Sequence, residues 1–360
     1  MDKTYVKIYL DEGFASEHGG GIGVYSELLL SGLTQTEFDV TPARYPRLQR
    51  IRIAALRRIL YSLYINLLLP GYLKKRSFAI AHFTNFQLPA RKNGFTKYIS
   101  TVHDLNPILY PDTVPPLYLK YYDRVMRNIV RNADCIITVS KSVKDAISKR
   151  YSFPERNIKV CSNALRADFL TGHVDSKILN DFALDFKNYF LFVGRLERKK
   201  NLVLLVKAFS EFKRETGSSG KLVLVGVRGF GFDEIAVARS ESGCENDIIL
   251  TGYVSLTELK TLYAAAGAFI LPSLDEGFCI PLVEAMGFGL PLILSDIATS
   301  REIVGSKAIY FDTECGESLK RVLVDFAQKS LQPVDYSEIL SKYSVEKMID
   351  SHLKVYAEVV

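Results

Sequence analysis

The chain carries, at residues 272–295, the stretch PSLDEGFCIPLVEAMGFGLPLILS. The apolar run at 268–271 that precedes it is typical of a buried strand, and Pro281 suits the first turn of a helix. We therefore expect a loop that carries Glu276, followed by a helix that carries Glu284. Because a loop that leads into a helix presents free backbone N–H groups, it favours a phosphate as its ligand.

Two carboxylates flank this predicted phosphate site. Because like charges repel, Glu276 and Glu284 are unsuited to bind the phosphates themselves, but carboxylates accept hydrogen bonds from sugar hydroxyls. A diphosphate site beside two acids that can bind diols predicts a nucleotide sugar as the ligand. The alternative interpretation is that Glu284 is a first-turn acid favoured by the helix dipole and Glu276 a solvated loop residue.

The residues around the two acids resemble a known family. They are similar to the E-x7-E signature of retaining glycosyltransferases of family 4, in the segments Glu276-Gly277-Phe278, Pro281 to Met286 and Gly289-Leu290-Pro291. The resemblance implies the GT-B fold, an α/β architecture in which two Rossmann-like domains place parallel sheets on either side of a cleft. It places an acceptor-binding domain at 1–170, a donor-binding domain at 171–342 and a closing helix at 343–360 that crosses back onto the first domain.

A turn rich in basic residues, Gly194 to Asn201, follows the apolar run at 189–193 and precedes an amphipathic stretch that predicts a helix. Basic side chains at such a turn suit a diphosphate. The resemblance assigns Arg195 and Lys200 to the leaving diphosphate, whereas Arg198 and Lys199 are expected to be solvated.

The resemblance assigns the other donor contacts by position. It gives Glu276 to the hydroxyls of the transferred sugar, Glu284 to the ribose, and the N–H groups of Gly277, Phe278, Cys279 and Ile280 to the diphosphate. Gly226 lies in a loop expected near the nucleotide, and Tyr253 is expected against the base or, alternatively, only in packing. Cys279 stands where relatives often carry glycine, so its side chain bears on how the donor fits.

The first half offers two further candidate positions. An apolar run, Tyr5 to Leu10, predicts a strand, and Gly20 and Gly21 precede a helix expected from Val24 to Leu33, so their N–H groups can approach a ligand. The serine at position 26, where a dinucleotide fingerprint has its third glycine, argues against a nicotinamide site. The resemblance turns this loop toward the transferred sugar and diphosphate; a flexible surface turn is the alternative.

His103 follows the predicted strand at 97–102. Residues just beyond the carboxyl end of a parallel strand line the ligand crevice. The stretch Thr101 to Asp104 resembles the family segment whose histidine lies beside the donor sugar, with Asp104 orienting the ring. A structural histidine that caps the loop would have the same sequence context.

The composition allows two α/β domains of ordinary size, because the chain has 360 residues of which 48% are hydrophobic. Asp2, Asp11 and Glu12 interrupt any apolar start, so we expect no signal peptide and a cytoplasmic protein. The apolar stretch at 60–73 contains Pro70 and is too short to span a bilayer. The five cysteines are scattered and predict neither a disulfide framework nor a zinc site.

Positive charge is concentrated in the first half. No acidic residue occurs between Val40 and His103, whereas this region contains Arg44, Arg47, Arg50, Arg52, Arg57, Arg58, Lys74, Lys75, Arg76, Arg91, Lys92 and Lys97. Such a region predicts an anionic partner. We expect no nucleic acid among the partners.

Residues 47–69 show helical periodicity. One sector contains Leu48, Ala55, Leu56, Ile59, Leu60, Leu63 and Leu67, and the opposite sector contains Arg47, Arg50, Arg57 and Arg58, while Arg52 breaks the pattern. A basic amphipathic helix suits an anionic membrane surface, so one interpretation is peripheral contact of residues 47–76 with the inner face of the cytoplasmic membrane. The other interpretation is an ordinary domain helix with a solvated basic face, and the sequence leaves both open.

The resemblance implies a retaining hexosyltransferase with no cofactor, and the lack of an Asp-x-Asp motif argues against the metal-dependent alternative fold. The implied donor is a nucleotide sugar, with GDP-mannose the first choice. The implied acceptor is a glycan or lipid-linked glycan in the synthesis of bacterial O-antigen or a related surface polysaccharide. The alternatives are a nucleotide-sugar-binding subunit without transfer activity, or an epimerase or phosphorylase of the same shape.

Overall fold

Two parallel six-stranded sheets organise the chain, one in each of two units. The computed structural model describes residues 6–13, 20–43, 45, 48, 51, 53–170, 176–328 and 332–360. The first unit comprises Met1–Ile108, Leu117–Ala164 and Val345–Val360, and the second comprises Leu109–Pro116 and Leu165–Ser344. The expected α/β class with two parallel sheets is confirmed.

The sheet of the first unit has the strand order β2-β1-β3-β4-β5-β6. Its strands are β1 (Lys7–Asp11), β2 (Asp39–Ala43), β3 (Ile80–Phe83), β4 (Lys97–Val102), β5 (Cys135–Thr138) and β6 (Ile158–Val160). Every pairing is parallel, and β1 pairs with β3 so that Leu10 lies opposite His82. Because parallel strands share one direction, all their carboxyl ends lie at one edge.

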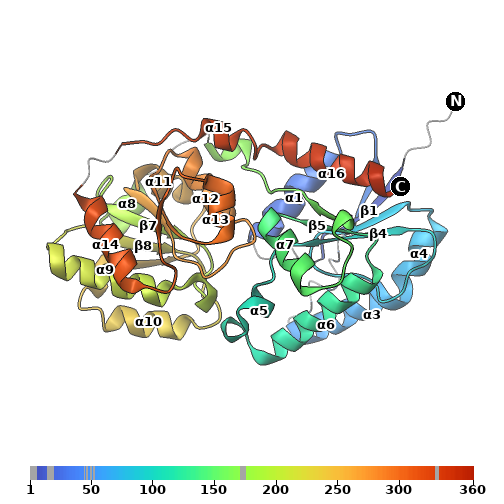
Figure 1. Cartoon of the computed structure of the whole chain (residues 1–360), viewed down its shortest axis with the longest axis horizontal. Helices are drawn as coiled ribbons and strands as arrows, with labels where there is room; N and C mark the ends of the chain where they lie inside the picture. Colours follow the sequence, from blue (N-terminus) through green and yellow to red (C-terminus); the bar gives the residue numbers. More distant parts are fainter. Residues whose placement is uncertain are drawn as a thin grey trace. The chain divides into compact units, whose positions relative to one another are not determined.

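Helices cover both faces of this sheet (Figure 1). On one face, α6 (Pro116–Asn132) and α7 (Lys141–Arg150) bury apolar side chains in the same core as β1, β3 and β4. The other face carries α1 (Gly21–Leu33) and the closing helix α16 (Val345–Val359), which is found at the expected residues. A side chain at Gly32 would collide with Ile349, so this glycine permits the close approach of α16 to α1.

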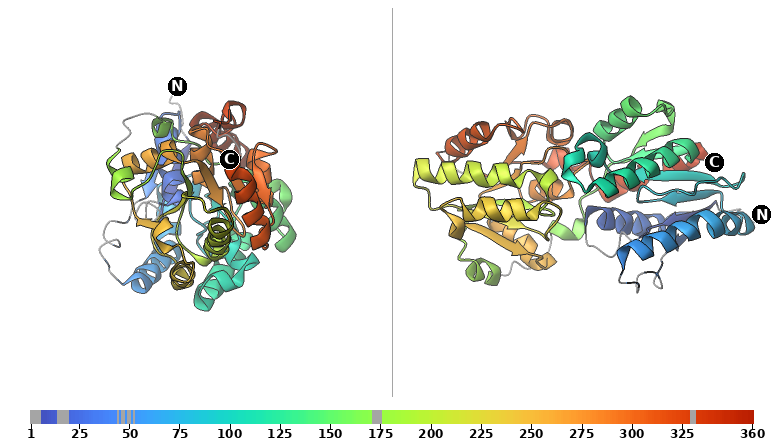
Figure 2. Two further views of the ribbon diagram at one scale, coloured as in Figure 1. Left: turned by 90° about the vertical axis from the view of Figure 1, so that its left-hand side faces the viewer. Right: turned by 90° about the horizontal axis from the view of Figure 1, so that it is seen from below.

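A helical rod of three segments packs on the same face as α6. It consists of α3 (Ala54–Leu63), the π-helical turn η2 (Tyr64–Leu68) and α4 (Leu69–Lys75), which form one continuous blue rod in Figure 2 (right). The side chains that it buries most deeply recur every four residues, at Tyr61, Ile65, Leu69 and Leu73. The wider π turn keeps that spacing on one side of the rod, which a regular 3.6-residue helix would not.

The apolar sector of this helix is largely exposed, a feature that bears on the two interpretations left open by the sequence. Four apolar side chains of the predicted sector are between 43% and 72% exposed, namely Leu56, Ile59, Leu63 and Leu67. The described helix also begins later than expected, at Ala54, and continues to Lys75. The expected positions Arg44, Arg47, Arg50 and Arg52, and the side chains of Ala55 and Arg58, lie outside what the structure describes.

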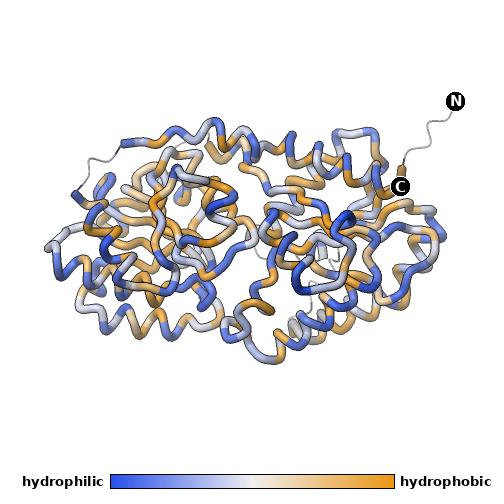
Figure 3. Tube along the Cα trace, in the orientation of Figure 1, coloured by the Kyte–Doolittle hydropathy of each residue, from blue (hydrophilic) through white to orange (hydrophobic). Residues whose placement is uncertain are grey.

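The sheet of the second unit has the order β12-β11-β10-β7-β8-β9. Its strands are β7 (Tyr189–Val193), β8 (Lys221–Val225), β9 (Ile248–Gly252), β10 (Ala268–Leu271), β11 (Leu292–Ser295) and β12 (Ile309–Phe311). Helices cover both faces, so the strands are near-continuous apolar runs. In Figure 3 the orange, hydrophobic segments concentrate inside each unit.

Aromatic contacts distinguish the two faces of this sheet. Phe190 of β7 contacts Phe209 and Phe212 of α9 (Leu202–Thr216) and Phe326 of α14 (Gly316–Ala327). On the other face, Tyr263 of α11 (Leu256–Ala265) contacts Phe269 of β10. The remaining helices are α8 (Lys177–Asp181), α10 (Phe232–Ser240), α12 (Ile280–Gly287), α13 (Ala298–Val304) and α15 (Ser337–Leu340). Among the described residues, no helix is both long and apolar enough to cross a bilayer.

Candidate active site

The carboxyl edge of the second sheet collects most of the predicted site residues. Arg195 and Lys200 follow β7, Gly226 follows β8, Tyr253 follows β9, and Glu276 to Ile280 follow β10, with Glu284 one turn into α12. These strands lie side by side in the order β10-β7-β8-β9. Residues that are far apart in the sequence therefore meet at one edge, as parallel topology requires.

The loop after β10 ends in backbone N–H groups that no described residue accepts. The amides of Gly277, Phe278, Cys279 and Ile280 donate to no oxygen in the described parts of the chain. Gly277, Phe278 and Ile280 are buried, and an unpaired buried N–H is costly unless a ligand or water satisfies it. Together with the amino end of α12, these groups suit an anion.

Glu276 is fixed by three contacts. Lys200 Nζ lies 2.5 Å from its Oε1, and the Ser273 hydroxyl donates to the same oxygen at 2.6 Å. The Thr299 hydroxyl donates to the Glu276 carbonyl oxygen at 2.6 Å. The two charged side chains are 13% and 6% exposed, so they form a nearly buried ion pair. Sequence analysis placed Glu276 and Lys200 at one site, and the structure brings them into direct contact.

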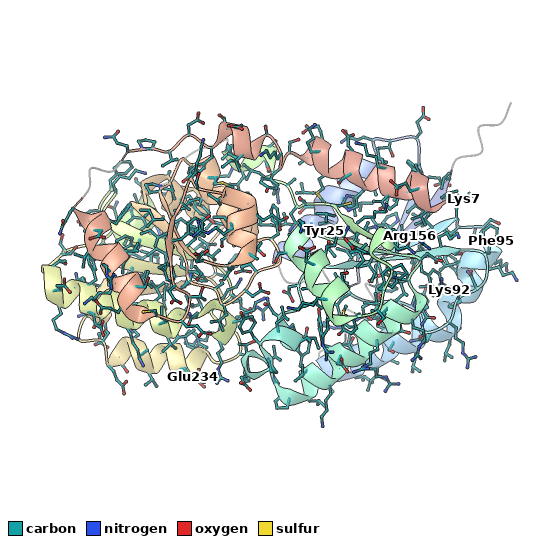
Figure 4. All side chains as sticks on the ribbon, viewed as in Figure 1. Lys7, Tyr25, Lys92, Phe95, Arg156 and Glu234 are labelled. Carbon is teal, nitrogen blue, oxygen red and sulfur yellow. The ribbon has the colours of Figure 1, made fainter. Side chains whose placement is uncertain are left out.

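The basic side chains of the turn after β7 differ in their contacts and exposure. Arg198 forms an ion pair with Glu234, which Figure 4 labels on α10. Lys199 lies 3.8 Å from Glu197 and its carbonyl accepts from the Leu274 N–H at 3.0 Å. These two residues were expected to be solvated; instead they tie the turn to its neighbours. Arg195 is exposed at the carboxyl edge.

Glu284 lies buried beneath the loop, where it is 9% exposed. The Tyr263 hydroxyl donates to its Oε2 at 2.9 Å. Burial raises the pKa of Glu284 to about 7, and the hydrogen bond from Tyr263 opposes part of that rise. A helix dipole alone would favour the charged form of a first-turn acid, whereas burial here favours the protonated form.

Gly226, Phe278 and Tyr253 have distinct local roles. Gly226 has φ +145°, and a side chain there would lie 1.9 Å from the Gly194 carbonyl oxygen, so the two turns can touch only with glycine. The ring of Phe278 is 3% exposed and packs edge-on against Tyr343, so the ring belongs to the core of its unit. Tyr253 is 80% exposed, so its ring contributes little to packing within its unit, and its contact with the base stays a prediction.

In the first unit, Gly20 and Gly21 lie at the start of α1. Gly20 is the N-cap, and its carbonyl accepts from the N–H of Gly23 at 2.8 Å. The helix thus begins at Gly21 rather than at Val24, because glycine is acceptable in the first turn. The described glycines form a helix start, not a free surface turn, and the residues at 14–19 before them lie outside the described chain.

His103 lies at the carboxyl end of β4 and is oriented by Thr84. Its Nε2 lies 2.7 Å from the Thr84 carbonyl oxygen and must donate to it. Burial lowers the pKa of His103, and this hydrogen bond opposes the shift, so the ring is neutral at pH 7. The ring nitrogen Nδ1 is then an acceptor, which fits a sugar hydroxyl rather than a phosphate. Asp104, which was expected to orient the ring, accepts from the Asn106 N–H at 3.2 Å, and its charge opposes the lowering of the His103 pKa.

Sequence analysis missed the residues that hold these groups in place. Ser273, Thr299 and Tyr263 fix the two glutamates, and Thr84 orients His103. Ser273 lies three positions before Glu276, so an ST-type contact could have been suspected. The others come from distant elements and left no local signal. Within the described residues, no group of three His, Cys, Asp or Glu side chains could hold a metal ion.

Two consecutive family models match most of the chain. Residues 19–169 match the model described as Glycosyltransferase Family 4, and residues 177–337 match Glycosyl transferases group 1. The chain belongs to glycosyltransferase family 4. The expected identity as a transferase enzyme is thereby confirmed.

Two bacterial proteins illustrate the sequence similarity of this glycosyltransferase. The O-antigen chain mannosyltransferase B of Escherichia coli is 28% identical over 262 residues, which are 72% of this chain and 67% of the relative. The O-antigen chain mannosyltransferase RfbU of Salmonella typhimurium is 28% identical over 250 residues, which are 69% and 66% of the two chains. The chain thus spans about two thirds of the length of these relatives.

Solved structures share the fold of this glycosyltransferase at low sequence identity. Sucrose-phosphate synthase from Thermosynechococcus elongatus has a TM-score of 0.76 with 19% identity and covers 98% of both chains. HepE of Anabaena, solved in complex with UDP and glucose, has a TM-score of 0.71 with 15% identity and covers 98% of this chain and 100% of its own. The predicted GT-B fold is confirmed.

Cys279 allows a test of backbone strain in the phosphate loop. It has φ +69°, a conformation that costs a non-glycine residue about 1–2 kcal/mol. At ordinary helical or extended positions alanine is more stable than glycine by about 0.5–1 kcal/mol. We expect the reverse order here, with Cys279→Gly more stable than Cys279→Ala in denaturant unfolding. A Cys279→Ala variant that equals or exceeds the glycine variant would show that the residue is not strained.

The raised pKa of Glu284 predicts a pH-dependent nucleotide affinity. An ionised carboxylate accepts hydroxyl hydrogen bonds more strongly than a protonated one, so affinity for a bare nucleoside should rise between pH 6 and pH 8. The gain is expected to be at most about tenfold, one pKa unit of free energy. The stability of the folded protein should change in the opposite direction and fall as the pH rises through 7. The native state holds the proton of Glu284 more tightly than the unfolded state does, so that proton stabilises the fold below pH 7.

Calorimetric titration of GDP and guanosine at several pH values checks this expectation. Using guanosine removes the titration of the phosphate itself. The isosteric variant Glu284→Gln is the control, and the ratio of wild-type to variant affinity should rise with pH. A ratio that stays constant from pH 6 to pH 8 would show that Glu284 does not contact the nucleoside.

Proposed function

We propose that the chain is a retaining, metal-independent mannosyltransferase that takes mannose from GDP-mannose and transfers it to a glycan or lipid-linked glycan in surface-polysaccharide synthesis. The observation that carries the proposal is the set of unpaired amides at Gly277 to Ile280 above the buried Lys200–Glu276 pair. Amides and a cation suit a departing diphosphate, and the carboxylate suits sugar hydroxyls. The choice of mannose rests on the names of the two O-antigen relatives.

The proposed step requires neutralisation of the charge that grows on the nucleoside diphosphate. Backbone N–H groups, Lys200 and Arg195 would supply it from fixed positions, and pre-placed donors are worth about 10²- to 10³-fold in rate each. Glu276 would bind a hydroxyl of the transferred sugar, Glu284 the ribose, and the exposed ring of Tyr253 the base. Neutral His103 would accept a hydrogen bond from the sugar through Nδ1. A step of this kind needs no Lewis acid.

A panel of nucleotide sugars tests the donor. We expect purified protein to release GDP slowly from GDP-mannose, and faster with a mannosylated oligosaccharide acceptor, while UDP- and dTDP-sugars give no release. Arg195→Ala should lower the rate about 10²-fold, because it removes one placed cation. Arg214→Ala removes another exposed arginine, at the end of α9, and should leave the rate unchanged.

Three further results test metal independence, retention of the anomeric configuration and transfer activity itself. The rate should persist in excess chelator, and the product should keep the α-anomeric configuration when followed by NMR. Loss of activity in chelator would contradict the metal-independent step, and anomeric inversion would contradict retention. A protein that binds GDP but transfers to no acceptor would favour a silent nucleotide-sugar-binding subunit.

We further propose that the helical rod attaches the protein to an anionic membrane surface. Its exposed row comprises Ile53, Leu56, Ile59, Leu63, Leu67 and Leu68, all at least 43% exposed. An ordinary domain helix would pack such a row against its sheet, but here the tyrosine-bearing side is packed. Tyr61 donates to buried Asp11 at 3.0 Å, which holds the rod with its apolar row outward.

Positive charge lies at the end of this rod. Lys74, Lys75 and Arg76 are exposed at the end of α4, and the loop at 90–96 adds exposed Arg91 and Lys92, of which Lys92 is paired with Asp134 at 2.7 Å. That loop is bound to the rod, since Asn93 donates to the Pro70 carbonyl at 3.1 Å. Figure 4 shows Lys92 and the half-exposed Phe95 at one end of this unit. Apolar side chains beside several cations fit anionic headgroups, at about 1 kcal/mol for each basic residue near the surface.

Vesicle co-sedimentation tests this attachment. We expect binding to phosphatidylglycerol vesicles that weakens with salt, and little binding to phosphatidylcholine. Replacing Ile59, Leu63 and Leu67 by serine should lower the water-to-membrane partition coefficient at least about tenfold, because it removes three apolar side chains that would be buried in the lipid. Leu117→Ser is the matched control, since Leu117 is 80% exposed on α6. A wild-type protein that ignores anionic vesicles, or that buries the row in a dimer abolished by the triple variant, would contradict the proposal.

A further inference from the structure

A chain of buried polar side chains connects the closing helix to the centre of the first unit. It comprises Tyr25 of α1, His82 of β3, Thr101 of β4, and His352 and Tyr356 of α16, each of them 0% exposed. Four hydrogen bonds of 2.7–3.0 Å join these five side chains in sequence. Polar groups this deeply buried are costly unless each is satisfied, so the arrangement is strongly specified.

The direction of each proton in this chain can be deduced. His352 Nδ1 lies 2.8 Å from the Met348 carbonyl oxygen, so it carries the proton and donates. Burial lowers the pKa of His352 to about 4, so the ring is neutral and its Nε2 is an acceptor. Tyr25 must therefore donate its hydroxyl proton to Nε2, at 2.7 Å. The Tyr25 oxygen can then only accept from Thr101, at 3.0 Å.

The protons of Thr101, His82 and Tyr356 can be placed in the same way. Because Thr101 has given its proton to Tyr25, it must accept from His82 Nε2, at 2.7 Å. Burial also holds the pKa of His82 well below its usual value, so His82 is neutral and its Nδ1 accepts from the Tyr356 hydroxyl at 2.7 Å. Only one proton arrangement is consistent with all the contacts. The Tyr25 hydroxyl thus depends on the closing helix for its acceptor.

Tyr25 in turn contacts His103. The two rings meet edge to face, with centroids 4.9 Å apart and an interplanar angle of 87°. The next residue of α1, Ser26, lies 2.8 Å from the Thr84 hydroxyl, and the Thr84 carbonyl accepts from His103. Two neighbouring residues of α1 therefore constrain the His103 ring. Tyr25 contacts the ring directly, and Ser26 bonds to Thr84, whose carbonyl oxygen accepts from Nε2.

We propose that Tyr25 and His352 are positioning residues for the transfer reaction, through which the closing helix α16 sets the orientation of the His103 ring. The inference rests on the proposed function only in that His103 is taken to contact the donor sugar. A ring held by one hydrogen bond could still swing about that bond, and the edge-to-face contact with an anchored tyrosine stops this rotation. The hydroxyl that anchors the tyrosine is itself held by a residue 327 positions away in the chain.

Variants that remove the anchor of Tyr25, compared with variants that restore or spare it, separate a positioning role from a general loss of stability. Tyr25→Phe keeps the ring beside His103 but removes the hydroxyl, and His352→Leu removes the acceptor. His352→Gln offers an amide oxygen near the position of Nε2 and should restore the anchor. Tyr356→Phe is the matched control. It removes a hydroxyl at the other end of the hydrogen-bonded series, and Tyr356 does not contact His103.

We expect Tyr25→Phe and His352→Leu to lower kcat about 3- to 10-fold with little change in donor KM, since misplacement of a reacting neighbour acts on the transition state. His352→Gln should recover most of that loss, and Tyr356→Phe should lower the melting temperature while kcat stays within about twofold. In a His103→Ala background, Tyr25→Phe should have no further effect on kcat. Additive losses in that double variant, or an equal loss of kcat in Tyr356→Phe, would overturn the positioning role.

A measurement independent of activity makes the test decisive. The chain has five histidines, so ¹⁵N-histidine spectra are simple, and the signals of His103 can be identified by their loss in His103→Gln. We expect these signals to shift in His352→Leu and to return in His352→Gln. Unchanged His103 signals would refute the connection. Shifted signals in a protein that turns over no donor would count against the proposed function alone.

Discussion

The ion pair between Lys200 and Glu276 is the interaction on which the second unit's site depends. Both side chains are almost withdrawn from water, and a buried charge that loses its partner costs roughly 3–5 kcal/mol. The pair therefore binds the turn after β7 to the loop after β10, and the Leu274 N–H reinforces it by bonding to the Lys199 carbonyl. A cation and an acceptor carboxylate are thus held in place without a ligand, which is what electrostatic preorganisation requires.

Parallel topology explains why such distant residues form one site. Arg195, Gly226, Tyr253 and Glu276 each follow a different strand, and the four strands are neighbours in the sheet. The close contact between Gly226 and Gly194 brings two of these turns together at the backbone level. In the first unit the same rule places the start of α1 and His103 at the carboxyl edge, after β1 and β4. Each sheet thus gathers its predicted site residues at its carboxyl edge.

The sequence was sufficient for those features that depend on local patterns. Apolar runs predicted strands such as β1, β4, β7 and β10, and the run at 268–271 together with Pro281 predicted the loop and helix that carry the two glutamates. It could not show that Tyr263 holds Glu284 or that Thr84 orients His103, because those contacts form only after folding. The rod shows a different limit. A 3.6-residue period identified its apolar row but could not reveal the π turn, which keeps a second row, at intervals of four residues, against the sheet.

The position of the positive charge bears on the two proposed anionic partners, a membrane surface and a diphosphate. Lys74, Lys75 and Arg76 precede β3, and Arg91 and Lys92 precede β4, so both groups lie at the amino edge of the first sheet. His103 lies at the opposite, carboxyl edge and is neutral, a group suited to hydroxyls. These five cations therefore lie away from the edge that carries His103. The proposed membrane surface would meet these cations at the amino edge and along the rod, whereas the proposed diphosphate site of the second unit relies on amides, Lys200 and Arg195.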